Sequence, residues 1–146
     1  MQLYAIPPDR LPEFWTLIEP FAQKIENRFP NEWPVYTIHE ATEAKELQLW
    51  MIADEDTRKV SGVVGTRIIT KASGKKVLDI AWMAGENREE WMHLLPKIEA
   101  FGADEGCEAI GFTGRWGWAP DLPDYQVEKL AHYEKALTEA RQRQAA

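Results

Sequence analysis

The sequence predicts one α/β domain with a mixed sheet, in which an antiparallel meander is followed by a crossover helix and a parallel strand. Two observations carry this prediction. Three strand-like runs follow one another between Leu47 and Ala84 with short turns between them, which is typical of antiparallel pairing. A helical apolar stripe and a further apolar run come next, and this strand, helix, strand order predicts a right-handed crossover. At 146 residues, the chain has the length of about one domain.

The N-terminal part is expected to form a short strand and two helices. The strand spans residues 2–6, and Pro7 ends it because proline offers no N–H to a strand ladder. Asp9 can then cap a helix. The apolar residues of this helix recur at steps of three or four: Leu11, Trp15, Ile18, Ala22, Ile25 and Phe29. Pro20 falls inside the stripe and should kink or split the helix, and a second helix is expected from about Tyr36 to Lys45.

The meander strands are expected at Leu47 to Ala53, Val60 to Thr70 and Val77 to Ala84. Their β-branched and aromatic content favours strands, and the segments between them are rich in turn-forming residues. Asp79 in the third strand has two interpretations. It can be a general base, or it can be an outward-facing residue that alternates with buried neighbours, and alternation is the simpler one.

The crossover is predicted from a second helical stripe. Asn87 followed by Glu90 resembles a capping box at the start of a helix. The apolar residues after it are Trp91, Leu94, Leu95, Ile98 and Phe101. The run from Cys107 to Thr113 then predicts a strand buried on both faces. Cys107, the only cysteine, is interpreted as a small buried residue at the start of that strand rather than as a nucleophile.

The C-terminal segment leaves two interpretations open. Residues 126–140 contain good helix formers, yet Ala131, Tyr133 and Lys135 also alternate as strand residues do. We expect one domain over residues 1–140 and a flexible tail over residues 141–146.

Composition excludes several classes of function. The net charge of −7 argues against nucleic-acid binding, which needs a basic face. No run approaches the roughly 20 apolar residues of a membrane span, and the N-terminus has no basic segment followed by an apolar one, as a secretion signal would. A single cysteine forms no internal disulfide, which fits a reducing compartment such as the cytoplasm, and equally a disulfide-free domain in any compartment. The three histidines, His39, His93 and His132, lack metal-ligand spacing, so no metal is expected, and His93 is interpreted as a surface residue.

Several short segments carry a resemblance to a known family. They are Gln48-Leu49-Trp50, Val64-Gly65-Thr66, Ala84-Gly85, Gly106-Cys107 and Gly114-Arg115-Trp116-Gly117-Trp118. With the order of the elements, they resemble the GNAT N-acetyltransferase superfamily. From Leu47 to Trp118 the chain resembles small GNAT-like proteins of tailed phages and prophages.

This resemblance implies a site for acetyl-CoA, whose pyrophosphate would sit on backbone N–H groups at the start of the crossover helix. That place corresponds to Ala84, Gly85, Glu86, Asn87 and Arg88. The superfamily loop has further glycines there, whereas this chain has three carboxylates, Glu86, Glu89 and Glu90. The loop is therefore degenerate, and the alternative is that the carboxylates only cap the helix.

Two further groups of residues are candidates for function. The resemblance implies a tyrosine as general acid beyond the last crossover strand, and Tyr125 and Tyr133 are the tyrosines of that region; each can instead pack with its hydroxyl at the surface. Arg115, Trp116 and Trp118 form a candidate ligand or partner loop. Arg115 can hold a phosphate or carboxylate there, or can stack on a tryptophan that packs on the sheet.

These observations lead to two main hypotheses. The first is an acetyl-CoA-dependent N-acyltransferase that acts on an amine of a small molecule or a protein, without a metal. The second is a non-catalytic GNAT-like phage or prophage protein with a virion, assembly or host-interaction role, whose partner is a phage structural or host protein. It would be found in the host cytoplasm or the virion. A weaker third hypothesis is a dimeric small-molecule binding module that uses the Arg115 loop. None includes a nucleic acid or a membrane, and a homo-oligomer is compatible with each.

Overall fold

The computed structural model describes residues 1–86, 92–113, 122–128 and 132–137. The chain divides into two compact units, Met1–Thr113 and Gly114–Ala146. All the helices and strands described here belong to the first unit. In the second unit, residues 122–128 and 132–137 form neither helix nor strand, so neither interpretation of residues 126–140 applies to these parts.

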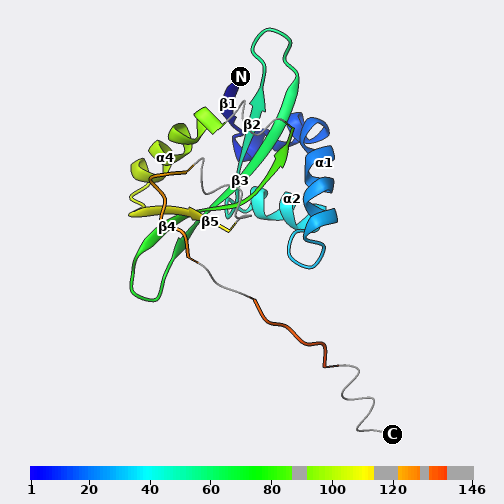
Figure 1. Cartoon of the computed structure of the whole chain (residues 1–146). Helices are drawn as coiled ribbons and strands as arrows, with labels where there is room; N and C mark the ends of the chain where they lie inside the picture. The colour runs from blue at the N-terminus through cyan, green and yellow to red at the C-terminus, as the bar shows by residue number, and fades with distance from the viewer. Residues whose placement is uncertain (87–91, 114–121, 129–131, 138–146) are drawn as a thin grey trace, which may run out of the picture. The chain divides into compact units, whose positions relative to one another are not determined.

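The first unit contains a five-stranded mixed sheet in the order β1-β2-β3-β4-β5 (Figure 1). The strands are β1 (Gln2–Ala5), β2 (Gln48–Ala53), β3 (Val60–Thr70), β4 (Lys76–Gly85) and β5 (Ala109–Phe112). The first four pair antiparallel, and β5 pairs parallel to β4. The predicted fold class, an antiparallel meander followed by a crossover helix and a parallel strand, is therefore confirmed.

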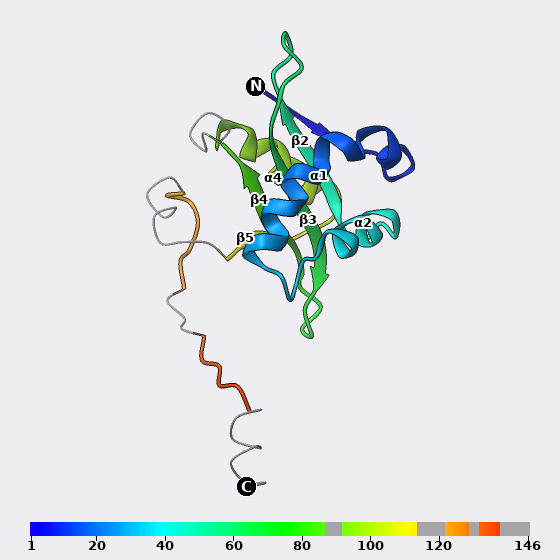
Figure 2. The same cartoon turned by 90° about the vertical axis from the view of Figure 1, so that its right-hand side faces the viewer.

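Helices cover both faces of the sheet (Figure 2). On one face lie α1 (Leu11–Arg28) and α2 (Val35–Glu43), which share one hydrophobic core with side chains of β2, β3 and β4. The other face carries α4 (Leu95–Asp104), preceded by the 3-10 turn η2 (Met92–Leu94). There the ring of Phe101 meets Trp50 edge to face at 5.1 Å between centroids. Trp50 is buried, as its place in a meander strand predicts.

The helix α1 runs without a break through Pro20, so the expected split does not occur. Proline inside a helix costs about 3 kcal/mol, mainly because one N–H is lost and one carbonyl is left without its donor. Here Pro20 and Thr16 are both exposed, so water can bond the freed carbonyl. The opposite side of α1 buries Leu11, Ile18 and Ile25 completely, at about 2 kcal/mol each, which offsets that cost.

Two expected helix caps also differ from the structure. Asp9 lies in a 3-10 turn, η1 (Pro8–Arg10), and Arg10 occupies the cap position of α1 without a side-chain hydrogen bond. The regular part of the crossover helix begins at Leu95, because Pro96 is tolerated only in a first helical turn. The proposed capping box at Asn87 lies outside the described residues.

The helix α2 is capped by a side chain of α1. The backbone N–H of Val35, the first residue of α2, donates to Oε1 of Glu26 at 3.0 Å. The amide of Gln23 donates to the other carboxylate oxygen at 2.8 Å. These bonds, led by that of Val35, lower the pKa of Glu26 below its ordinary value. The cap thereby ties the two helices together across the loop that joins them.

The last strand is less buried than its sequence predicts. All four residues of β5 are half-buried, and so is Cys107, which precedes the strand. The reason is that, among the residues that the structure describes, β5 ends the row of five strands, so only its β4 side is covered by a neighbouring strand. His93 is exposed, as expected. Among the helices described, none is long and apolar enough to cross a membrane.

Candidate functional site

The two halves of β4 differ in their neighbours. β3 pairs with β4 from Lys76 to Gly85, whereas β5 pairs only with Val77 to Ile80. The outer edge of Ala81–Gly85, which we call the open edge, has no strand partner among the described residues. Because successive residues of a strand direct their N–H and C=O groups to opposite sides, part of the backbone along the open edge points away from β3. This edge offers hydrogen-bond donors and acceptors to a ligand.

A β-bulge lies where the pairing with β5 stops. Gly65 pairs with Trp82 and Thr66 with Ile80, so Ala81 is the extra residue of β4. A bulge bends its strand and increases the local twist, and bulges are frequent beside active sites. The extra residue also reverses the face of the sheet to which the following side chains of β4 point. Ile80 lies on the same side as Thr66, whereas Trp82 joins the core beneath α1.

Two glycines allow the open half of β4 and β3 to pack closely. A Cβ at Gly65 would lie 2.6 Å from Cε2 of Trp82, so the indole ring packs directly on the β3 backbone. At the end of the strand, a Cβ at Gly85 would lie 2.7 Å from the carbonyl oxygen of Ser61. The absence of a side chain at Gly85 is thus explained by strand packing. Sequence reasoning missed the bulge, although a glycine within the β-branched run 60–70 is a signal for one.

The predicted cofactor residues lie at the end of the open edge where the structure describes them. Ala84 is buried and Gly85 is exposed, and they are the last two residues of β4. The N–H of Glu86 donates to the carbonyl of Ser61 at 3.1 Å, which continues the pairing with β3 by one residue. Asn87 and Arg88 lie outside the described residues. Ala84, Gly85 and Glu86 are consecutive in sequence, and the structure adds that they lie at the end of the open edge, which has no strand partner in the described part of the chain.

The other predicted site residues belong to the second unit. Tyr125 lies in a turn in which its N–H donates to the carbonyl of Leu122 at 3.1 Å. Tyr133 is 89% exposed. Arg115, Trp116 and Trp118 lie outside the described residues. The catalytic role of the tyrosines and the ligand role of the loop stay predictions.

Asp79 in the paired half of β4 has a structural partner. It alternates with buried Leu78 and Ile80, as expected, and its Oδ2 accepts a bond from Nε of Arg67 at 2.8 Å. The guanidinium of Arg67 lies over the ring of Trp33, 5.5 Å from its centroid. Trp33 in turn meets Trp82 edge to face, so this row of contacts connects the two halves of the strand. Asp79 is thus accounted for as a residue that holds Arg67.

The part of the chain that the structure describes contains no group of three or more His, Cys, Asp or Glu side chains placed to hold a metal ion.

One buried polar group beside the open edge lacks a hydrogen bond within the described residues. The indole N–H of Trp82 is buried and has no hydrogen-bond partner within the described residues.

Comparison with known proteins identifies the fold. No protein-family model matches the sequence, and no curated protein matches it. Solved structures do match. A probable acetyltransferase covers 94% of this chain and 99% of its own, with a TM-score of 0.67 and 11% identity. An aminoglycoside acetyltransferase from an uncultured soil metagenomic sample covers 94% of this chain and 96% of its own, with a TM-score of 0.65 and 15% identity.

A third match is the ribosomal-protein-alanine N-acetyltransferase from Brucella melitensis biovar Abortus 2308. It covers 93% of this chain and 99% of its own, with a TM-score of 0.61 and 11% identity. At these identities the likeness concerns the fold and not the substrate. The chain has the mixed α/β fold of the GNAT acetyltransferases.

Proposed function

We propose that the protein is an acetyl-CoA-dependent N-acetyltransferase of the GNAT type. The observation that carries this proposal is the open edge of β4, which begins at the bulge residue Ala81 and ends at Gly85. An extended ligand with amide groups can bond to such an edge as a missing strand would. When bound, acetyl-CoA supplies the thioester whose acetyl group is transferred, and its pantetheine arm has amides of this kind.

The phosphate end of the cofactor would lie where β4 ends. In this proposal, the segment of Ala84, Gly85, Glu86, Asn87 and Arg88 holds the pyrophosphate through the cation of Arg88 and through backbone N–H groups other than that of Glu86, which bonds to Ser61. The loop is degenerate because Glu86, and in sequence Glu89 and Glu90, place negative charge near an anion. We therefore expect weaker cofactor binding than a glycine-rich loop would provide.

The chemistry needs two proton transfers by the chain. One group must take a proton from the acceptor amine, and another must protonate the departing thiolate. We propose Tyr125 or Tyr133 as the acid, on the basis of their place after β5 in the sequence. The acceptor is an amine of a small molecule or a protein.

The cofactor can be tested by thermal unfolding with and without acetyl-CoA. A ligand that binds only the folded state stabilises it by about 2.7 kcal/mol at a hundredfold excess over its Kd, so the midpoint should rise. Arg88→Glu should reduce the rise, whereas Lys71→Glu, in the exposed β3–β4 turn, should not. No change of midpoint at millimolar acetyl-CoA would contradict the proposal, and release of coenzyme A with a panel of amines would identify the acceptor.

The acidic loop favours a second function, a non-catalytic GNAT-like protein of a phage or prophage. In that case the carboxylates after β4 stabilise the helix N-terminus and no cofactor binds. The same titration separates the two functions, because only the enzyme gains stability from acetyl-CoA.

A further inference from the structure

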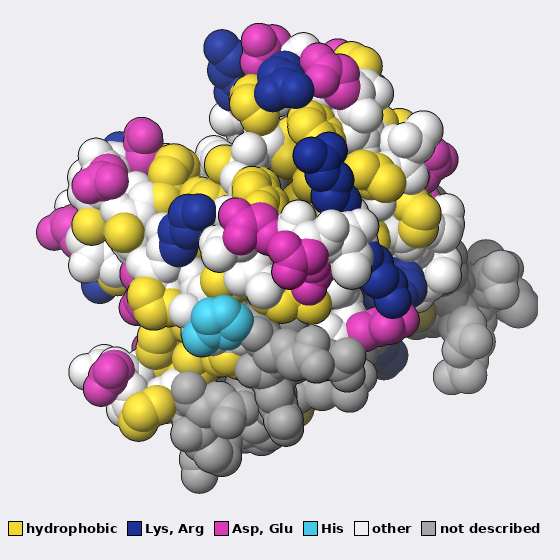
Figure 3. All heavy atoms as spheres, turned by 90° about the horizontal axis from the view of Figure 1, so that it is seen from above, with side chains coloured by type: hydrophobic (Ala, Val, Ile, Leu, Met, Phe, Trp, Pro, Cys, Tyr) yellow, Lys and Arg dark blue, Asp and Glu magenta, His cyan; other side chains and the backbone are white. Residues whose placement is uncertain are grey.

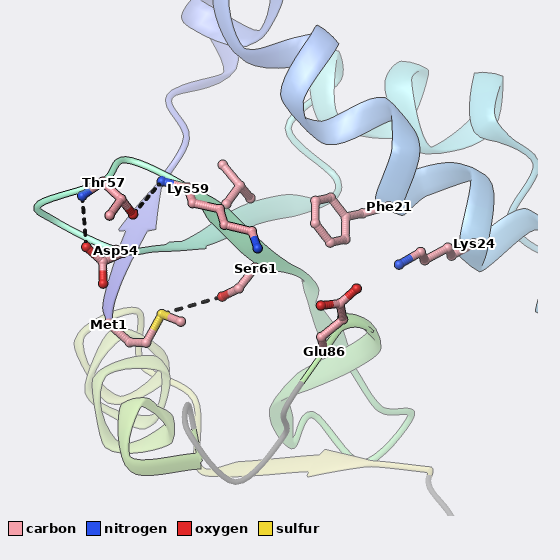
Figure 4. Close-up of a pocket in the computed structure, with 9 residues that line it drawn as sticks. Met1, Phe21, Lys24, Asp54, Thr57, Lys59, Ser61 and Glu86 are labelled. Atoms are coloured by element: carbon pink, nitrogen blue, oxygen red, sulfur yellow. Dashed lines mark hydrogen bonds between the residues drawn. The ribbon is translucent and has the colours of Figure 1, made fainter.

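A cavity of about 280 Å³ lies beside the end of β4 (Figure 4). Four separate parts of the chain line it: the N-terminus, α1, the β2–β3 connection with the start of β3, and the residue that follows β4. The lining residues that matter below are Phe21, Lys24, Lys59, Ser61 and Glu86, together with Asp54. The open edge ends next to this cavity, because Glu86 directly follows Gly85.

Two lysines direct their ammonium groups into this cavity from opposite sides, Lys24 from α1 and Lys59 from the β2–β3 connection (Figure 4). The Nζ of Lys24 lies 5.3 Å from the ring centroid of Phe21, which holds the cation toward the cavity. Neither ammonium forms an ion pair or a hydrogen bond with any residue that the structure describes. Other cations of this unit, such as Arg10 and Arg67, do have carboxylate partners.

The carboxylates of the cavity are not equivalent. Asp54 is engaged in its own turn, where Oδ1 accepts the N–H groups of Asp56 and Thr57 at 2.9 Å each. These bonds, that of Thr57 first, lower the pKa of Asp54, so it stays ionised as part of the turn. Glu86 points into the space between the two lysines (Figure 4). It is the group that competes with an anion for the ammonium groups.

Hydroxyl donors lie at the same place. Ser61 lines the cavity, and its Oγ has only long contacts, 3.5 Å to the sulfur of Met1 and 3.5 Å to the carbonyl of Ile52. It can therefore turn toward a ligand at small cost. On the face seen from above, acidic and basic side chains are interspersed, so that face carries no general basic patch (Figure 3).

We propose that this cavity binds a phosphate group between Lys24 and Lys59. A tetrahedral phosphate has enough oxygens to accept bonds from two ammonium groups that approach from different sides and from the Ser61 hydroxyl. Two sources of phosphate fit this place: the phosphates of coenzyme A at the end of the open edge, and a separate small phosphorylated ligand. The inference does not require acetyl transfer, because the lysines, the cavity and the hydroxyl belong to the folded chain in either case.

The test compares two double variants with equal loss of charge. Lys24→Gln/Lys59→Gln removes the cavity cations, and Lys71→Gln/Lys75→Gln removes two exposed lysines of the β3–β4 turn as the control. All four side chains are exposed, so both variants should fold. Affinities for inorganic phosphate, coenzyme A and pantetheine, which has no phosphate, are measured at fixed ionic strength, since binding to ammonium groups weakens with salt. We expect the cavity variant to bind phosphate at least about tenfold more weakly than the control variant.

The outcomes separate the two sources. If the cavity variant also loses affinity for coenzyme A but not for pantetheine, the cofactor supplies the phosphate; if its coenzyme A affinity is unchanged, the ligand is a separate phosphate compound. Glu86→Gln should bind phosphate severalfold more tightly, because it removes the competing charge. Equal affinities of the two double variants for both phosphate and coenzyme A would overturn the inference. A protein that binds phosphate through the lysines but never binds coenzyme A would contradict only the proposed function.

Discussion

The two halves of β4 belong to one strand and have different surroundings. Val77–Ile80 lies between β3 and β5 and is held on both sides by strand pairing. Ala81–Gly85 pairs with β3 alone and presents its other edge without a strand partner among the described residues. Both halves alternate buried and less buried residues, so the burial pattern does not distinguish them. The comparison shows that the candidate site is a feature of the backbone: the open edge begins at the extra residue, Ala81, where the pairing with β5 has stopped.

The two halves also pack against different helices. In the paired half, Leu78 is so close to α4 that a Cβ at Gly102 would lie 3.0 Å from its Cδ2. In the open half, Trp82 belongs to the core beneath α1 and lies on Gly65. The open half thus has fewer strand bonds and depends more on a single aromatic contact.

The largest expected effect is therefore from Gly65→Ala. The added Cβ meets the Trp82 ring at 2.6 Å, so the ring or β3 must move, and overpacking of this kind costs about 2 to 3 kcal/mol. Gly111→Ala on β5 is the control, because its Cβ would meet nothing within 4 Å. Urea unfolding of both variants measures the difference. Equal stabilities would show that the open half does not depend on this contact.

Amide hydrogen exchange should distinguish the halves directly. We expect the amides of Val77–Ile80 to be protected, and alternate amides of Ala81–Gly85 to exchange faster by on the order of a hundredfold, because the N–H groups of the open edge have no strand partner within the described ranges. Saturating acetyl-CoA should slow the fast amides if the cofactor bonds to the open edge. Uniform protection along the strand without ligand would mean that the edge is covered.

A smaller effect is expected from the ion pair of the paired half. A double-mutant cycle with Arg67→Met and Asp79→Asn should give a coupling of about 0.5 kcal/mol, because both side chains are partly exposed and solvent weakens the attraction. The coupling should fall further in high salt. A coupling of zero would show that Asp79 does not hold Arg67.

The smallest expected effect lies away from β4, at the cap that Glu26 provides for α2. Its pKa is lower in the folded chain than its ordinary value, mainly through the Val35 N–H, so the charged cap stabilises the fold above the unfolded pKa. That contribution is lost as the pH falls through the folded pKa. Stability measured from pH 7 down to pH 3 should therefore fall more steeply for the wild type than for Glu26→Gln. If the stability of both proteins fell equally with pH, Glu26 would not act as a charged cap of α2.

Much of the fold is predictable from local pattern. The strand predicted at Val60 to Thr70 has the same bounds in the structure, and the second helix differs by one or two residues at its ends. Parallel pairing of the last strand follows from its place after the crossover helix. These features depend on hydrophobic periodicity and turn residues, which any segment carries in its own sequence.

Other features did not follow from local pattern. The helical stripe around Pro20 is compatible with a break, and burial of the opposite face of α1 kept the helix whole. The apolar run of β5 suggested burial on both faces, and its place at the end of the sheet left it half-buried. In each case the result depended on which other elements cover the segment.

The sequence by itself determined the order and type of the elements and the residues that end β4, since side-chain periodicity is a local property. Only the tertiary structure decided that Ala81 is a bulge, that β5 stops beside it and that Lys24 and Lys59 converge on one cavity. The physical reason is that strand register and the meeting of distant segments are set by packing across the whole sheet. No single segment contains that information.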